Sequence, residues 1–295
     1  RNAALYFGTF CVSPSFNGSM ELFEKISNRR SFFSISTKDS LEDGSVLVES
    51  EVTNVASSYI ASFLPNLNWL EKLDVNFSGK ASIRIDNAGV VDTVDFQVLS
   101  EAKNELAVGL DGKLKIHPEY KGYLNIPEGT VNIQARNFPL SEAERYWPPT
   151  FGVDARNWVV KNINKGLIQK LTTKIMVTPD DFIAGVVSGK SIDGSFGYSD
   201  VSVIYMENFP PVTAASGVAK FNGDVLNFDV QDGRMKQSTV KGTVSMYNLS
   251  AVNPDMEINV TTEGTIADIS DFLAMIQQGS KSTDKLLDIT HLSGS

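Results

Sequence analysis

The chain has 295 residues, of which 42% are hydrophobic and 21% charged, and this composition is typical of a folded protein rather than a disordered one. Acidic residues outnumber basic ones by 35 to 26, and no dense lysine and arginine tract occurs, which argues against nucleic acid as a partner. The single cysteine excludes an internal disulfide, and no apolar stretch reaches the roughly 18 residues of a membrane-spanning helix.

The first 65 residues carry only weak structural signals. Residues 20–26 are compatible with a short helix and residues 46–52 with a strand, and segment 1–65 otherwise receives no assignment. The chain starts without methionine and ends in polar residues. We therefore expect a fragment of a longer protein whose targeting and membrane-anchoring segments lie elsewhere.

Residues 66–140 are predicted to form a β-rich half. From residue 74 to 86, apolar or small residues occupy every odd position and polar residues every even one. A strand turns successive side chains to opposite faces, so this period of two predicts one apolar and one polar face. The pattern recurs over residues 106–116 and 131–135. Asn87-Ala88-Gly89 is typical of a hairpin turn, and Asp111-Gly112 of a turn or a bulge.

Residues 141–166 are predicted to be a helical segment between two β-rich halves. Ser141 and Glu144 have the spacing of a capping box, and a second helix is expected from Asp154 to Gly166. Its apolar stripe contains Trp158 and Val159, so we expect the Trp158 indole to be buried against the sheet.

Residues 167–295 are predicted to be a second β-rich half that ends in a short helix near residues 268–278. Alternation recurs over residues 171–177, 226–230, 240–246 and 256–266, and Asn222-Gly223 and Asp232-Gly233 are expected to form turns.

These patterns predict a mainly β, mostly antiparallel fold with a few short helices. Nine strands of this length would offer an apolar face on the order of 1500 Å², of which three short helices could cover about 500 Å². The sheet could close on itself as a sandwich or barrel, or curl into a groove that holds apolar ligands. The residues expected to line the shared apolar surface are Val75, Phe77, Ile83, Ile85, Val108, Leu110, Phe228, Val244, Met246, Met256, Ile258 and Val260.

No arrangement of residues typical of catalysis or metal binding is found in the sequence. The two histidines are far apart, and neither HExxH nor CxxC occurs. Asp180-Asp181 follows Thr178-Pro179 and is typical of a solvated turn, and Ser195 does not lie in a GxSxG motif. We expect a non-enzymatic protein without cofactor or metal.

Two groups of residues resemble the AsmA-like periplasmic proteins, in particular the YhdP-like branch. The first group is Asn137-Phe138-Pro139, Tyr146-Trp147-Pro148-Pro149, Ala155-Arg156-Asn157-Trp158-Val159, Asn162-Ile163 and Gly166. The second is Phe209-Pro210-Pro211-Val212, Gly217, Leu226, Phe228, Gly233-Arg234, Gly242, Val244 and Leu249. Together they cover about residues 130–270.

The resemblance implies a bridge-like lipid transfer protein. With it we expect a mainly β fold class: an elongated, curved antiparallel sheet that forms a taco-shaped groove, with a few short helices. Members of this family are anchored in the inner membrane of diderm bacteria, lie in the periplasm, and are linked to phospholipid transport and outer-membrane homeostasis. The implied partner is therefore a phospholipid or another acyl-chain lipid, with no cofactor and no catalytic residue, and no protein partner is indicated.

The motif residues Trp147, Pro148, Arg156, Trp158 and Gly166 have structural as well as functional interpretations. The tryptophans could contact lipid or anchor a helix on the sheet. Arg156 could hold a phosphate headgroup or form a helix-to-sheet ion pair. The alternative function is a structural or interaction β-sandwich with a sealed core.

Overall fold

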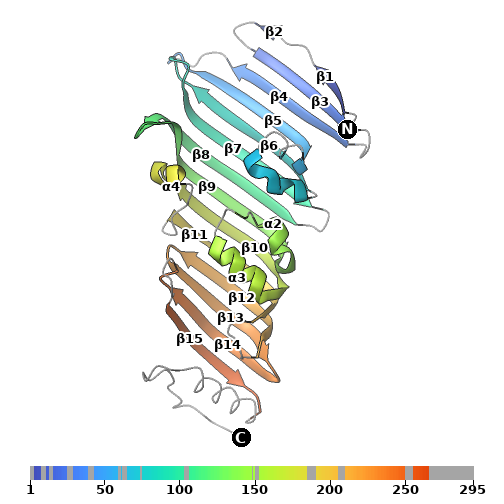
Figure 1. The fold of residues 1–295 in the computed structure, drawn as a ribbon, viewed down its shortest axis with the longest axis vertical. Coiled ribbons are helices and arrows are strands. Elements are labelled where there is room, and N and C mark those ends of the chain that lie inside the picture. The colour runs from blue at the N-terminus through green and yellow to red at the C-terminus, as the bar shows by residue number, and fades with distance from the viewer. Residues whose placement is uncertain are drawn as a thin grey trace.

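The structure is a computed structural model that describes residues 3–7, 11–12, 16–24, 29–38, 43–58, 61, 65–73, 75–102, 106–147, 149, 153–184, 191–204, 210–249 and 255–265. Fifteen strands form one sheet, and each pair of neighbouring strands is antiparallel (Figure 1). Their order in the sheet follows the chain, except that β2 pairs only with β3. The strands are β1 (Ala3–Phe7), β2 (Cys11–Val12), β3 (Phe16–Glu24), β4 (Arg29–Lys38), β5 (Val46–Ala56), β6 (Val75–Ile85), β7 (Val91–Ala102), β8 (Ala107–Tyr120), β9 (Tyr123–Pro139), β10 (Ile163–Val177), β11 (Ile192–Val203), β12 (Val212–Asn222), β13 (Val225–Met235), β14 (Ser238–Tyr247) and β15 (Asp255–Glu263).

The helical elements are few and short, as the sequence predicted. They are η1 (Pro65–Lys72), η2 (Leu140–Glu142), α2 (Ala143–Tyr146), α3 (Val153–Asn162) and α4 (Pro179–Ala184). η1, α2 and α3 lie on one side of the sheet, in front of it in Figure 1. The predicted fold class is confirmed: a mainly β chain built as an open, curved antiparallel sheet.

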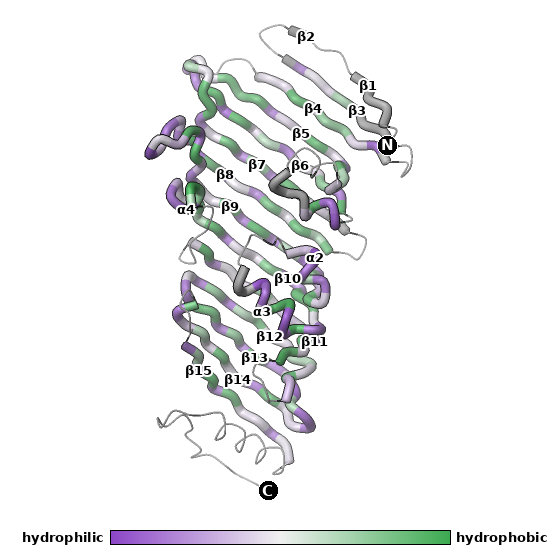
Figure 2. The backbone as a smooth tube through the Cα atoms, in the orientation of Figure 1, coloured by the Kyte–Doolittle hydropathy of each residue, from purple (hydrophilic) through white to green (hydrophobic). Residues whose placement is uncertain are grey.

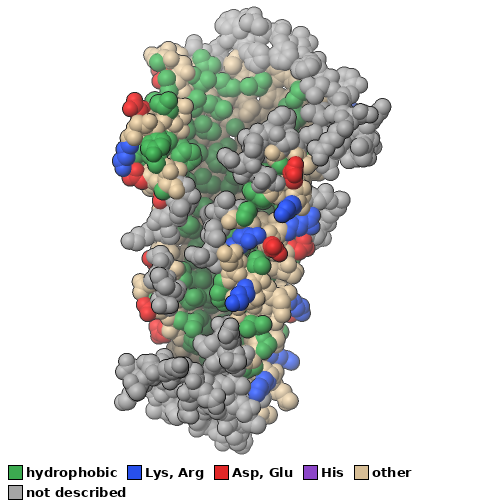
Figure 3. Space-filling view, in the orientation of Figure 1, with side chains coloured by type: hydrophobic (Ala, Val, Ile, Leu, Met, Phe, Trp, Pro, Cys, Tyr) green, Lys and Arg blue, Asp and Glu red, His purple; other side chains and the backbone are tan. Residues whose placement is uncertain are grey.

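The sheet is curved, and strand bulges contribute to its curvature. The pairing register shifts between Val52 and Val55, near the end of β5. It shifts again near the end of β11 and near the start of β12, which lie at the same edge of the sheet. A bulge adds an unpaired residue to one strand, which bends that strand and increases its twist. Ala214, inside the β12 bulge, has a φ of 48°. Figure 3 shows the resulting face as a hollowed surface.

The described N-terminal residues form strands, so one of the two predictions for this segment is wrong and the other is confirmed. Residues 20–26 were expected to form a short helix, but Met20 lies in the middle of β3, which pairs with β1 and β4. Phe16, Gly18 and Met20 alternate with polar residues, so strand partners from other parts of the chain outweigh the local helical signal. The strand predicted at residues 46–52 is part of β5.

Both halves of the chain belong to the same sheet. β9 and β10 pair directly over ten positions, from Leu167 with Pro139 to Val177 with Gly129. The helical segment is therefore a long connection at one edge of a continuous sheet. The helix expected near residues 268–278 lies outside the described residues.

Several local predictions are corrected by backbone geometry. The capping box is absent, because Ser141 lies inside η2 and neither η2 nor α2 has a side-chain cap. Gly166 does not end a helix. It lies in β10, where an added Cβ would come within 2.8 Å of the Val201 side chain. Asp111-Gly112 lies inside β8 with unbroken pairing, and Asp232-Gly233 is a bulge in β13. The turns predicted at Asn87-Ala88-Gly89 and Asn222-Gly223 are present.

Candidate functional site

One face of the sheet is apolar along the length of the molecule. Strand alternation produces this face, and the hydropathy of each strand changes from residue to residue in Figure 2. The register aligns one row of side chains across thirteen strands, with no charged residue in it. At a strand spacing of about 4.8 Å, this row is about 60 Å long. Its members, from β3 to β15, are Met20, Phe33, Val52, Gly79, Val98, Leu110, Ile133, Thr173, Gly194, Phe221, Leu226, Met246 and Met256.

A second uncharged row runs beside the first from β6 to β15. Figure 3 shows hydrophobic side chains gathered in the hollow of this face of the sheet. We call this surface the apolar face. The second row consists of Phe77, Ser100, Val108, Ala135, Leu171, Phe196, Ala219, Phe228, Val244 and Ile258.

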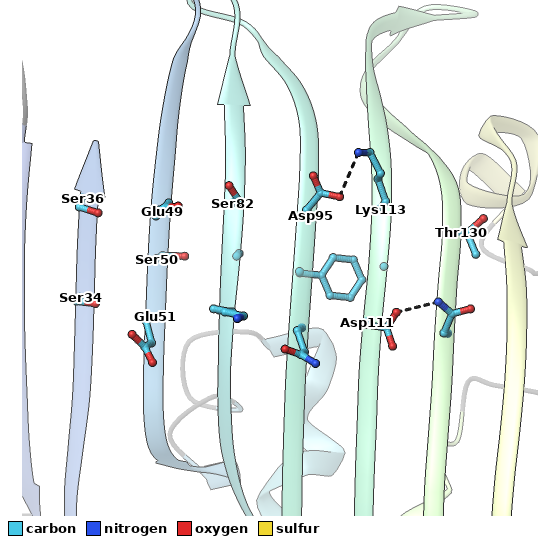
Figure 4. A pocket seen from close by; sticks show the side chains of 16 residues that line it. Ser34, Ser36, Glu49, Ser50, Glu51, Ser82, Asp95, Asp111, Lys113 and Thr130 are labelled. Atoms are coloured by element: carbon cyan, nitrogen blue, oxygen red, sulfur yellow. Dashed lines mark hydrogen bonds and ion pairs between the residues drawn. The ribbon is translucent and has the colours of Figure 1, made fainter. Parts of the chain in front are cut away.

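The opposite face is polar. Its rows mix carboxylates, lysines, amides and hydroxyls, and one of them runs Ser34, Glu51, Lys80, Gln97, Asp111, Asn132 and Lys174. A shallow open hollow lies on this face over β4–β9 (Figure 4). In it, Lys113 pairs with Asp95 at 3.7 Å, and the Asn132 amide donates to Asp111 at 2.8 Å. Its charged and hydrogen-bonded lining does not suit an apolar ligand.

No second sheet covers the apolar face among the described residues. Met256 and Ile258 are 45% and 48% exposed, and most of the face is half-buried. Local clusters do occur. Leu70 and Leu73, in and just after η1, pack with Val75, and Val159 of α3 packs against the buried cluster that includes Leu140 and Tyr198. The apolar face is therefore a partly roofed, unsealed trough.

Aromatic rings line the trough between β11 and β13. Phe196 has ring centroids 6.2 Å from both Tyr198 and Phe228, and 6.3 Å from Phe221. The buried Tyr198 hydroxyl donates to the Asp229 carbonyl at 3.3 Å. Burial, helped by the nearby Asp229 charge, raises the pKa of Tyr198 to about 12. Its polar atom is therefore satisfied within an otherwise apolar wall.

Glycines on the apolar face make room for these rings. A Cβ on Gly194 would lie 2.5 Å from the Phe221 ring and 2.3 Å from the Thr172 carbonyl oxygen. Gly112 lies in the same way under Phe96, whose ring would be 2.6 Å from an added Cβ. Each glycine therefore leaves space above its own backbone for the ring of a neighbouring strand.

All twelve residues that the sequence analysis singled out lie on the apolar face. They occupy β6, β8, β13, β14 and β15, which the register connects through the intervening strands. Val75, at 6% exposed, is covered from the η1 side, so it supports the helical roof instead of lining open surface. That these residues bind lipid remains a prediction.

Sequence reasoning missed part of the same face. Val94, Phe96 and Val98 of β7 alternate with Asp95 and Gln97. This alternation can be read from the sequence, and it predicts a strand between those at residues 74–86 and 106–116.

The motif residues of the helical segment take roles other than those expected. Trp158 is 44% exposed, so the expected burial against the sheet is wrong. Among the described residues, Arg156 forms no ion pair to the sheet. Its Nε donates to the Trp147 carbonyl at 3.0 Å and an Nη to the Glu144 carbonyl at 2.7 Å. Arg156 thus ties α3 to the end of α2. Pro148 lies outside the described residues.

The residues weighed for catalysis lie in ordinary surroundings. Asp180 pairs with Lys121 at 2.7 Å, and Asp181 accepts a hydrogen bond from the Thr178 hydroxyl at 2.7 Å. Ser195 lies on the polar face, 3.4 Å from the Thr172 hydroxyl. Within the described ranges, no group of three or more potential metal ligands occurs, and no helix is long and apolar enough to cross a bilayer.

Comparison with known proteins identifies the family. The family described as YhdP protein matches residues 64–295, which is well over half of the chain. No curated protein and no solved structure matches the chain. Because the matched range covers η1 and all strands from β6 onward, the chain belongs to the YhdP family, an AsmA-like family of the cell envelope.

Proposed function

We propose that this protein binds phospholipid acyl chains on its apolar face and conducts them along the sheet in the bacterial periplasm, without catalysing a reaction. The observation that carries the proposal is the uncharged row that crosses thirteen strands on an unsealed face. Membership of the YhdP family supports the same proposal.

Acyl chains suit this surface because removal of their CH₂ groups from water would be sufficient to bind them. Each CH₂ group removed from water contributes about 0.8 kcal/mol. A row that continues from strand to strand without a charged residue would keep that contribution from being interrupted. A lipid could then slide without crossing a large barrier, and no chemical step is needed.

The alternative function, a structural β-sandwich, required a sealed core. The described residues form one sheet, and its apolar face is half-exposed. Contiguous exposed apolar surface of this size is rare on soluble monomers and marks a binding surface. The periplasmic setting and the inner-membrane anchor of the full-length protein are part of the proposal.

A pair of arginine substitutions tests the proposed function. Leu110 lies in the middle of the apolar face, whereas Leu99, on neighbouring β7, is 53% exposed on the polar face. Leu110→Arg should reduce the phospholipid that mass spectrometry finds in organic extracts of the purified protein, because it places a charge among the acyl chains. Leu99→Arg introduces the same charge on the other face and should leave the lipid content unchanged.

Melting temperatures of both variants show whether the fold survives. If wild-type protein carries no lipid after purification and takes none from phospholipid vesicles, the transport proposal fails. Equal lipid loss in both variants would also contradict it, since the effect would not depend on the face.

A further inference from the structure

The two long edges of the trough differ in charge. In an antiparallel meander, alternate connections lie at opposite ends of the strands. One edge, here called the turn edge, consists of the connections after β4, β6, β8, β10, β12 and β14. The other, the helical edge, consists of those after β3, β5, β7, β9, β11 and β13, and includes η1, α2 and α3.

The described turn-edge connections hold five acidic residues and one basic residue, a net charge of −4. The one basic residue, Lys121, is already paired with Asp180. A lipid phosphate at this edge would meet repulsion without a free cationic partner among the described residues of these connections. The acidic residues are Asp43, Asp86, Asp180, Asp181 and Asp224.

The described helical-edge connections hold five basic and four acidic residues, a net charge of +1. The basic residues are Lys72, Arg145, Arg156, Lys161 and Lys236. Glu71 and Glu144 lie in η1 and α2 together with Lys72 and Arg145, and Asp154 lies in α3. Glu142 of η2 pairs with Arg145 at 3.5 Å, so Arg145 is already partnered.

Two arginines join the helical edge into one unit. Arg145 donates to the Lys72 carbonyl at 3.2 Å, which links α2 to the end of η1. Arg156 donates to the carbonyls of Glu144 and Trp147, which links α3 to α2. These hydrogen bonds tie η1, α2 and α3 to one another along the helical edge.

Helix α3 presents an amphipathic contact at this edge. Val159 packs down onto the sheet, while Trp158 and Lys161 are both exposed. Residues three apart are neighbours on a helix surface, so Trp158 and Lys161 lie on the same exposed side of α3. Tryptophan next to a cation suits the boundary between acyl chains and headgroups, where one side is apolar and the other wet.

The two edges would act separately on a bound headgroup. Strands of 10 to 17 residues, such as β14 and β9, span roughly 33 to 56 Å, whereas charges are screened beyond about 8 Å at physiological salt. A phosphate at one edge therefore feels that edge alone.

We infer that a phospholipid in the trough lies with its phosphate at the helical edge, against Lys161 and Trp158 of α3, and with its acyl chains on the apolar face. This inference rests on the proposed function and adds a fixed orientation of the lipid across the sheet. The turn edge then excludes anionic headgroups.

Photo-labelling with two lipids tests the orientation. The first probe is a phosphatidylethanolamine whose amine is acylated with a diazirine, so that its headgroup is anionic and reactive. The second carries the diazirine at the end of an acyl chain. The headgroup probe is expected to label peptides of the helical edge about fivefold more than peptides of the turn edge. One lysine near an anionic lipid surface contributes about 1 kcal/mol, which corresponds to this ratio. The acyl probe should label strand peptides.

Lys161→Glu should remove most of that preference. Lys220→Glu is the matched control, because it makes the same charge change on an exposed position of the polar face of β12. Equal headgroup labelling at both edges, with acyl label on the strands, would overturn the orientation and leave lipid binding intact. If neither probe labels the protein, both the orientation and the proposed function fail.

Discussion

Gly194 illustrates how a single residue controls the apolar face. Gly194 of β11 lies next to the Phe221 ring of β12. Gly197, three residues later, is on the polar face, where an added Cβ would meet the Gln169 side chain at 3.5 Å. The same residue type therefore has different importance on the two faces of one strand.

We expect Gly194→Ala to destabilise the fold by about 1–3 kcal/mol, the usual cost of overpacking. The added methyl group must displace the Phe221 ring or the Thr172 carbonyl. Gly197→Ala, which makes only ordinary contact, should be nearly neutral. Chemical denaturation of both variants measures the difference, and equal effects would mean that the ring does not rest on the Gly194 backbone.

At the scale of elements, the helical segment is held differently from what its sequence suggested. Trp158 and Val159 appeared to share one apolar stripe, but neighbouring residues on a helix point about 100° apart. Of these two residues, Val159 packs against the buried cluster on the sheet, as does Ile163, which already belongs to β10. Hydrogen bonds also hold the helical segment, because Arg145 and Arg156 donate to carbonyl groups of the preceding elements.

Trp158→Ala should therefore change the free energy of unfolding by less than about 1 kcal/mol, as is usual for exposed positions. Leu140→Ala is the comparison, because Leu140 is 7% exposed within the cluster beneath this segment. Its loss should cost about 2–5 kcal/mol. Thermal or urea unfolding distinguishes the two, and a large loss for Trp158→Ala would show that the indole is an anchor.

At the scale of the whole molecule, the decisive feature is that the sheet stays open. Ile258 of β15 faces the trough and remains 48% exposed, and Asn259 is exposed on the opposite face of the same strand. In a sealed sandwich, an arginine at position 258 would bury an unpaired charge and unfold the protein.

Ile258→Arg should instead fold, with a melting temperature close to that of Asn259→Arg, because the long side chain can reach solvent at the rim. The lipid content should fall in Ile258→Arg alone. Differential scanning calorimetry and lipid extraction on both variants provide the two measurements. Unfolding of Ile258→Arg alone would mean that this part of the face is covered.

The sequence by itself determined the fold class and the composition of the face. Period-two alternation is a local property, so it placed residues such as Phe77, Leu110 and Val244 on one side of their strands without knowledge of any partner. The tertiary structure alone decided that these strands align into one uncharged row, that the sheet stays open, and that the strands β1 to β5 extend it. It also decided that Trp158 faces outward while Arg156 binds carbonyls. These features depend on register, bulges and contacts between residues far apart in the chain, and such pairings have no periodic signature in the sequence.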